Sequence, residues 1–165
     1  MPELSLCVQY AVPADALPRW RLRRWVRRAL DAAAADLAAR GQPPLAGAGF
    51  TLRLVSEAEG RTLNQTWRRG EQATNVLTFE YGVDPDGVAG GDIVLCVPVL
   101  EREAQEQGKP LRDHAAHLVI HGVLHALGYD HVDPEEARHM EALETALLAH
   151  MGIADPYAPR PDPGA

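Results

Sequence analysis

The chain has 165 residues, which is enough for one domain whose hydrophobic core needs no disulfide bonds. Its composition, 46% hydrophobic and 24% charged, is that of an ordinary globular protein, and no apolar run approaches the roughly 18 residues that span a membrane. The net charge of −7 argues against a general nucleic-acid binder, but residues 1–82 carry +3 and residues 83–165 carry −10. A basic binding surface would therefore have to come from the first half.

The first half of the chain predicts two strands and two helices. An apolar stripe with arginines on its solvent side and a glycine after it indicates a helix, and Ser56 with Glu59 forms a capping box that starts another. The expected elements are strand Leu4–Ala11, helix Arg19–Arg40, strand Phe50–Val55 and a helix from Ser56 through Trp67.

The second half predicts two more strands and then only helices. The strands are Thr74–Glu80 and Asp92–Val99, separated by a Gly/Asp/Pro-rich loop at Tyr81–Gly91; the helices run from Pro98 to about Gln107, from Leu111 to Leu127 and from Pro134 to His150. The fold class that follows is α+β, with about four strands in one sheet and helices packed on it. We expect a single domain over residues 1–157 and a disordered, proline-rich tail over 158–165.

The N-terminus and the cysteines predict the cellular compartment. No basic and apolar secretion signal precedes the first strand, and Cys7 and Cys96 each lie in an apolar stretch. We expect two reduced core thiols in a soluble cytoplasmic protein that does not contact membranes.

Residues 121–131 contain three histidines at the spacing of a zinc-protease helix, H-E-x-x-H-x-x-G-x-x-H. His121 and His125 would project from one helical face one turn apart, and Gly128 would end the helix and bring His131 back as a third ligand. The pattern predicts one metal ion on a central helix and the following turn. Zinc fits the ligand type best, although imidazole also binds nickel, copper and iron.

Gly122 stands where the protease motif has its glutamate base. Three neutral histidines would leave a fourth position open for water, as in catalytic zinc sites. The chain is therefore expected to keep the metal without being an ordinary metalloprotease. We interpret the missing carboxylate as room for a polyanionic substrate.

Several polar residues near this motif have more than one interpretation. His114 and His117 lie on the same helical face as the predicted ligands, where they would support the metal, contact a phosphate or form local hydrogen bonds. Asp130 would orient an imidazole or cap the turn.

Arginines supply the cations that phosphodiester cleavage needs. Arg68 lies just before the strand at Thr74 and is either a solvated charge at the end of a helix or a cation that meets negative charge on a phosphate, while Trp67 could stack on a base. The arginine-rich face Arg19–Arg28 is either a solvated helix surface or a contact to nucleic-acid phosphates.

Four segments, in order, resemble the YbeY family of bacterial rRNA-maturation endoribonucleases over roughly residues 50–157. They are Asn64–Arg68, Thr74–Phe79, Gly91–Cys96 and His114–His131, followed by Met140, Glu141 and Glu144. The chain departs from the family pattern at Trp67, Thr78 and Ala126, where tyrosine, serine and leucine are usual.

The resemblance implies a zinc-dependent endoribonuclease that acts on single-stranded rRNA, in 16S rRNA 3′-end processing and ribosome biogenesis, with the small ribosomal subunit as partner. It implies His121, His125 and His131 as the zinc ligands and Arg68 as important for activity. Two alternatives remain: a ribosome-assembly factor whose zinc is structural, and a metalloprotease. The sequence leaves open which group is the base and whether water or the RNA 2′-hydroxyl is the nucleophile.

Overall fold

The computed structural model describes residues 1–67, 74–130 and 132–158. Within them the elements are β1 (Glu3–Tyr10), α1 (Arg19–Ala39), β2 (Gly47–Val55), α2 (Glu57–Trp67), β3 (Val76–Val83), β4 (Val88–Cys96), α3 (Val97–Glu106), α4 (Leu111–Ala126) and α5 (Pro134–His150). In this part of the chain we find no helix with the length and apolar character needed to cross a bilayer.

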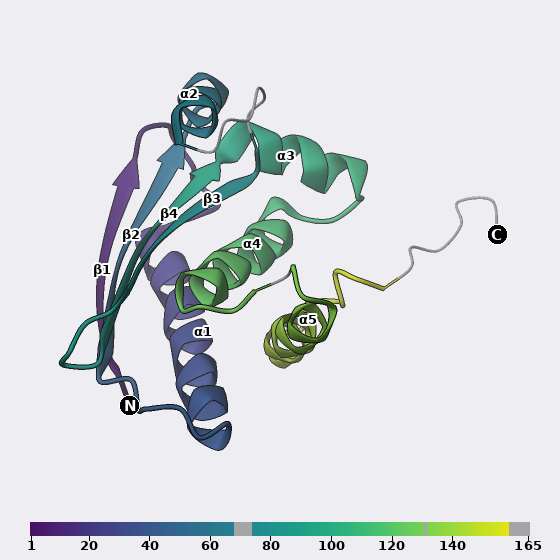
Figure 1. The fold of residues 1–165 in the computed structure, drawn as a ribbon. Coiled ribbons are helices and arrows are strands. Elements are labelled where there is room, and N and C mark those ends of the chain that lie inside the picture. The colour runs from purple at the N-terminus through teal and green to yellow at the C-terminus, as the bar shows by residue number, and fades with distance from the viewer. Residues whose placement is uncertain (68–73, 131, 159–165) are drawn as a thin grey trace.

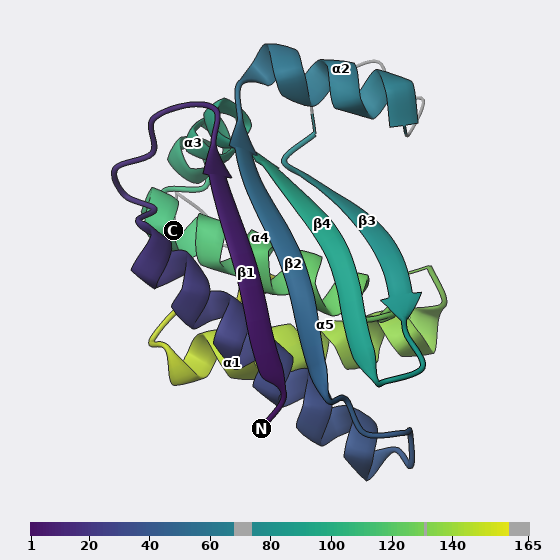
Figure 2. The same ribbon diagram turned by 90° about the vertical axis from the view of Figure 1, so that its left-hand side faces the viewer.

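The four strands form one sheet in the order β1-β2-β4-β3. Strands β1, β2 and β4 are parallel, and β3 runs antiparallel to β4. Helices α1 and α4 cover one face of the sheet, with α5 outside them, while the opposite face is open and α2 lies across one end (Figures 1 and 2). The predicted α+β domain with four strands is confirmed.

Helix α4 is the centre of the domain. Ten of its sixteen residues are buried, because it packs between the sheet on one side and α1, α3 and α5 on the others. A helix that is apolar nearly all round needs such an interior position. The three histidines His117, His121 and His125 are half-buried exceptions on one side of it.

The prediction of a loop at Tyr81–Gly91 is wrong. Strand β3 continues to Val83 and β4 begins at Val88, so that only a four-residue hairpin turn joins them. The Oδ1 atom of Asp84 accepts hydrogen bonds from the backbone N–H groups of Asp86 and Val88, which fixes this turn. Turn-forming residues were present, but antiparallel pairing extends through most of the segment.

Several other boundaries also differ from the prediction, and strand β2 begins at Gly47 instead of Phe50. Strand β4 ends at Cys96 instead of Val99, because α3 begins at Val97 with Pro98 in its first turn. Cys96 is buried as expected, whereas Cys7 is exposed on the open face of the sheet. The Ser56 cap is confirmed, since its Oγ atom accepts from the backbone N–H of Glu59 at 3.1 Å.

The chain beyond α5 contacts this helix near the end of the predicted domain. Tyr157 donates a hydrogen bond to Glu144 of α5. Residues 159–165 lie outside the described part of the chain, so the predicted disordered tail stays a prediction.

One row of arginines on α1 contacts the outer edge of β1. Arg19, Arg23 and Arg27 follow one another at four-residue intervals and therefore share a helical face. Their guanidinium groups donate to the backbone carbonyls of Val8, Leu4 and Pro2, at 3.3, 3.5 and 2.5 Å. These three cations are part of the framework of the fold.

Gly122 lies where α4 packs tightly against the sheet. A Cβ atom at this position would lie 2.9 Å from Cγ2 of Ile93 in β4 and 3.5 Å from Oγ1 of Thr78 in β3. One turn later the contact repeats, because a Cβ on Gly91 would lie 3.0 Å from Cβ of Ala126. Position 122 therefore faces the sheet, and our interpretation of Gly122 as room for a polyanionic substrate is wrong.

Replacing Gly122 by alanine is expected to destabilise the protein. Alanine favours an isolated helix by about 1 kcal/mol over glycine, but the added methyl group must push α4 away from Ile93, and overpacking typically costs about 1–3 kcal/mol. Urea denaturation of Gly122→Ala measures the change in the free energy of unfolding. Gly49→Ala is the control, since a Cβ at position 49 meets nothing within 4 Å; equal stability of both variants would contradict the steric role.

Candidate metal centre

Three histidines form a row along α4. His117, His121 and His125 are spaced four residues apart and so project from the same side of the helix. The rings of His121 and His125 are nearly parallel, 9° apart, with their centroids separated by 6.4 Å. The predicted metal-binding pair is thus brought together on one face.

His121 is held by a buried carboxylate from α5. Its Nδ1 atom hydrogen-bonds to Oε1 of Glu144 at 2.5 Å, and the Glu144 side chain is completely buried. The other carboxylate oxygen accepts from the hydroxyl of Tyr157 and lies 3.6 Å from Nε2 of His117. All the groups around this carboxylate are therefore donors or potential cations.

The surroundings of Glu144 keep its carboxylate ionised. Burial by itself raises the pKa, but hydrogen bonds from His117, His121 and Tyr157 and the charge of His121 together lower it to about 2. A buried anion of this kind needs a compensating cation nearby. A metal-bound imidazole at His121 would provide one.

His125 is oriented by the backbone of the turn that follows α4. Gly128 has φ +100°, and the turn is a Schellman motif, with Gly128 N–H bonded to the His125 carbonyl and Tyr129 N–H to the Leu124 carbonyl. This geometry places the Tyr129 carbonyl 3.1 Å from Nδ1 of His125, which donates to it. The predicted role of Gly128 in ending the helix is confirmed.

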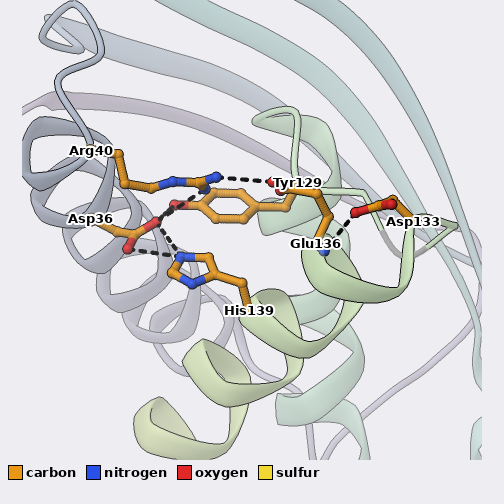
Figure 3. Close-up of polar contacts among 6 residues, drawn as sticks. All are labelled: Asp36, Arg40, Tyr129, Asp133, Glu136 and His139. Carbon is orange, nitrogen blue, oxygen red and sulfur yellow. Dashed lines mark hydrogen bonds and ion pairs between the residues drawn. The ribbon is translucent and has the colours of Figure 1, made fainter.

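A polar cluster between α1 and α5 holds the turn in place (Figure 3). The hydroxyl of Tyr129 donates to Oδ2 of Asp36 at 2.5 Å, and the same carboxylate lies 2.9 Å from Nε2 of His139. Arg40 completes the cluster with an ion pair to Glu136 at 3.0 Å. Burial raises the pKa of Asp36, but the bonds from Tyr129 and His139 outweigh it and lower the pKa overall.

The donor set fits a metal ion. In neutral imidazole a proton on Nδ1 leaves the ring lone pair on Nε2, and His121 and His125 both have Nδ1 bonded to a protein oxygen. Histidine ligands of metals are typically fixed in this way by a carboxylate or a backbone carbonyl. The tautomers are thus set for ligation through Nε2.

A second metal-binding combination exists in the described part of the chain. Ligand atoms of His117, His121 and Glu144 all lie within 4.8 Å of one another, so this group could also bind a metal ion. Within this group, however, Glu144 already hydrogen-bonds to His121, and Nε2 of His117 hydrogen-bonds to the hydroxyl of Tyr157 at 3.1 Å. We therefore regard Glu144 as the group that orients His121.

The structure bears differently on each of the other predicted site residues. His131 and Arg68 lie outside the described residues, so their predicted roles stay predictions. His114 is buried and bonds through Nε2 to Glu103 of α3 at 2.9 Å, a carboxylate that also accepts from Asn75. Asp130 accepts from the backbone N–H of Val132, so it caps the turn.

The sequence reasoning assigned no role to three supporting residues, although Glu144 and Tyr129 lie among the segments that resemble the family. Glu144 carried a signal: Met140, Glu144 and Leu148 are the buried residues of α5, so a glutamate sits in the middle of an apolar stripe. Tyr129 and Asp36 carried none, because they are 93 residues apart and meet only in the folded chain.

A fixed negative charge also lies beside the centre. Oε1 of Glu80, on β3, is 3.7 Å from Nε2 of His125. Nothing in the local sequence of the strand pointed to this contact.

Comparison with known proteins places the chain in a family. The family model described as "Endoribonuclease YbeY" matches residues 12–152. The chain belongs to the YbeY family. This membership supports an endoribonuclease role.

Individual relatives agree with the YbeY family match. The chain is 68% identical to "Endoribonuclease YbeY" of Bordetella pertussis over 155 residues, covering 94% of this chain and 96% of the relative. It is 47% identical to the protein of the same name from Ralstonia nicotianae, covering 97% of this chain and 81% of the relative. A Thermotoga maritima protein solved in solution has the same fold, with a TM-score of 0.53 at 22% identity over 94% of this chain and 99% of that one.

Replacing Tyr129 by phenylalanine is expected to weaken metal binding by up to about tenfold, because the turn that carries the His125 acceptor loses its bond to Asp36. Competition with a chromophoric chelator measures the zinc affinity. Tyr10→Phe is the matched control, since its hydroxyl donates to the Leu17 carbonyl. Equal zinc affinities of the two variants would show that the Asp36 bond does not support the centre.

Proposed function

We propose that this protein is a zinc-dependent endoribonuclease that cleaves single-stranded rRNA. We further propose that it acts in 16S rRNA 3′-end processing during ribosome biogenesis in the cytoplasm, with the small ribosomal subunit as partner. Membership of the YbeY family and the name "Endoribonuclease YbeY" of its relatives support the nuclease assignment. The zinc dependence, the rRNA substrate and the role in 16S rRNA processing are proposed from the sequence motifs.

The observation that carries this proposal is the bond between Nδ1 of His121 and the buried carboxylate of Glu144. A fully buried, ionised glutamate is costly unless hydrogen bonds and a partner cation stabilise its charge. Together with the His125–Tyr129 bond, it presents two imidazoles in the tautomer that binds zinc. We propose His131 as the third ligand of one ion.

The residues of the chain define what such a site can do. Zinc, when bound, supplies a Lewis acid beside a phosphodiester and lowers the pKa of coordinated water. His121 and His125 fix where the scissile phosphate must lie, and Glu144 and Tyr129 keep both rings from turning. Arg68 is proposed to meet the charge that develops on the phosphate oxygens.

The end of α2 offers a surface for a base next to Arg68. Trp67, the last residue of the helix, is 65% exposed, and its ring packs edge-on against Phe79 with centroids 6.5 Å apart. An exposed indole held by a second aromatic ring can stack on an unpaired base. This supports a single-stranded substrate.

The two alternatives differ from this proposal in testable ways. In a metalloprotease the residue after His121 supplies the base, but position 122 faces Ile93 and Thr78 with no room for a side chain. A ribosome-assembly factor with a structural zinc would need the metal only for folding. The experiments below separate it from the nuclease.

The zinc ligands are tested by comparing His131→Ala with His117→Ala. We expect His131→Ala to lose stoichiometric zinc, since it removes a proposed ligand, and His117→Ala to keep it. Metal content after gel filtration is the measurement. Loss of zinc from His117→Ala with retention in His131→Ala would instead identify the group of His117, His121 and Glu144 as the metal site.

Cleavage is tested with His121→Ala and Arg68→Ala on single-stranded rRNA fragments. We expect each to lose activity by about 10²–10³-fold, as when one group that stabilises transition-state charge is removed. Arg61→Ala, an exposed arginine on α2, is the matched control for Arg68. A 2′,3′-cyclic phosphate on the product would identify the RNA 2′-hydroxyl as the nucleophile.

Undiminished cleavage by His121→Ala would refute the nuclease mechanism. The structural-zinc alternative predicts that this variant loses metal and folding stability together while ribosome association persists. Digestion of casein by the wild-type protein would favour the protease.

A further inference from the structure

A basic hollow lies at the end of the molecule where α1 and α4 begin and α5 ends. Its volume is about 480 Å³, within the range of pockets that hold small ligands. The charged, titratable and aromatic residues that matter for its chemistry are Trp20, Arg21, Arg24, Arg28, Arg112, Asp113 and His150. The proposed nuclease centre uses none of them.

The arginines of α1 divide into two rows with different surroundings. Arg19, Arg23 and Arg27 donate to carbonyls of β1 and of the preceding Pro2, as described above. The second row, Arg21, Arg24 and Arg28, lines the hollow. Within the described part of the chain, the guanidinium groups of Arg24 and Arg28 form no hydrogen bond or ion pair.

Trp20 provides an aromatic surface at the rim. Its side chain is 58% exposed, although a large indole is usually covered in a folded protein. The guanidinium carbons of Arg21 and Arg24 lie 4.9 and 5.7 Å from the ring centroid. Exposed aromatic rings beside arginines are the arrangement that binds single-stranded nucleic acid by stacking and charge.

The local charge is positive in a chain whose net charge is −7. Arg112 adds a cation from α4, and the acidic lining residue Asp113 is 3.7 Å from its Nε atom. The first turn of α1 follows Pro18, which cannot cap it with a side-chain oxygen, and contains no acidic residue, so partial positive charge remains at this helix end. At the start of α4, which follows Pro110, Asp113 offsets that charge. A polyanion is the ligand that this combination favours.

We propose that the hollow binds single-stranded RNA, with phosphates on Arg24 and Arg28 and a base stacked on Trp20. This inference rests on the proposed function, since it takes RNA as the ligand. Arg112 and His125 are thirteen residues apart on α4, which corresponds to roughly 20 Å along the helix axis. The hollow therefore holds the strand away from the cleavage centre and adds affinity for longer substrates without reading their sequence.

The test measures binding and cleavage separately. The double variant Arg24→Gln/Arg28→Gln should bind a labelled 2′-O-methyl RNA strand about tenfold more weakly by fluorescence anisotropy. The negative slope of the logarithm of the association constant against the logarithm of the salt concentration should become shallower by about 1.4, since each lost phosphate contact removes about 0.7 for single strands. Trp20→Leu should weaken binding severalfold with the salt slope unchanged.

Arg19→Gln/Arg23→Gln is the matched control, because it removes the same charge from the same helix but from the row on β1. We expect it to bind RNA within about twofold of the wild type, and circular dichroism checks that all variants are folded. Cleavage of a dinucleotide, too short to reach the hollow, should be unchanged in Arg24→Gln/Arg28→Gln.

Equal RNA affinities for the two double variants would overturn the inference. The inference would also be overturned if binding of a polyglutamate peptide required Arg24 and Arg28 while binding of RNA did not, because the hollow would then bind an acidic protein. Failure of the wild-type protein to cleave rRNA would refute the proposed function instead, and would leave these binding results standing.

Discussion

The close contact of α4 with the sheet at Gly122 sets how the histidines of the centre lie against β3 and β4. Because no Cβ separates the helix from Ile93, α4 lies deep against these two strands. Glu144 comes from α5, which lies outside α4, and hydrogen-bonds to His121. A glycine that first suggested a missing catalytic group is thus the steric condition for the packing of the helix that carries the histidines.

The elements of the fold could be predicted from local patterns, because apolar periodicity, the Ser56 cap and the glycine after α4 act over a few residues. Helices α4 and α5 were placed within one residue of their ends. Strand pairing could not be predicted, since the hairpin at Asp84 depends on a partner strand. The same limit hid Asp36, whose bond to Tyr129 joins residues 93 apart.

The candidate centre shows how a buried charge is stabilised by several distant segments. Glu144 comes from α5, His121 from α4 and Tyr157 from the chain beyond α5. Each contributes a donor, so the carboxylate stays ionised in spite of its burial. The motif alone gave the histidines, but their orientation comes from residues that no histidine spacing could indicate.

The arginines along β1 also affect how the protein can associate with other copies of itself. An outer strand offers unpaired carbonyls to which a strand of another chain can hydrogen-bond, and such strand addition is a common start of aggregation. Guanidinium groups already occupy the carbonyls of Pro2, Leu4 and Val8. Helix α1 therefore both covers the sheet and obstructs part of its outer edge, so that a strand of another copy meets fewer free carbonyls there.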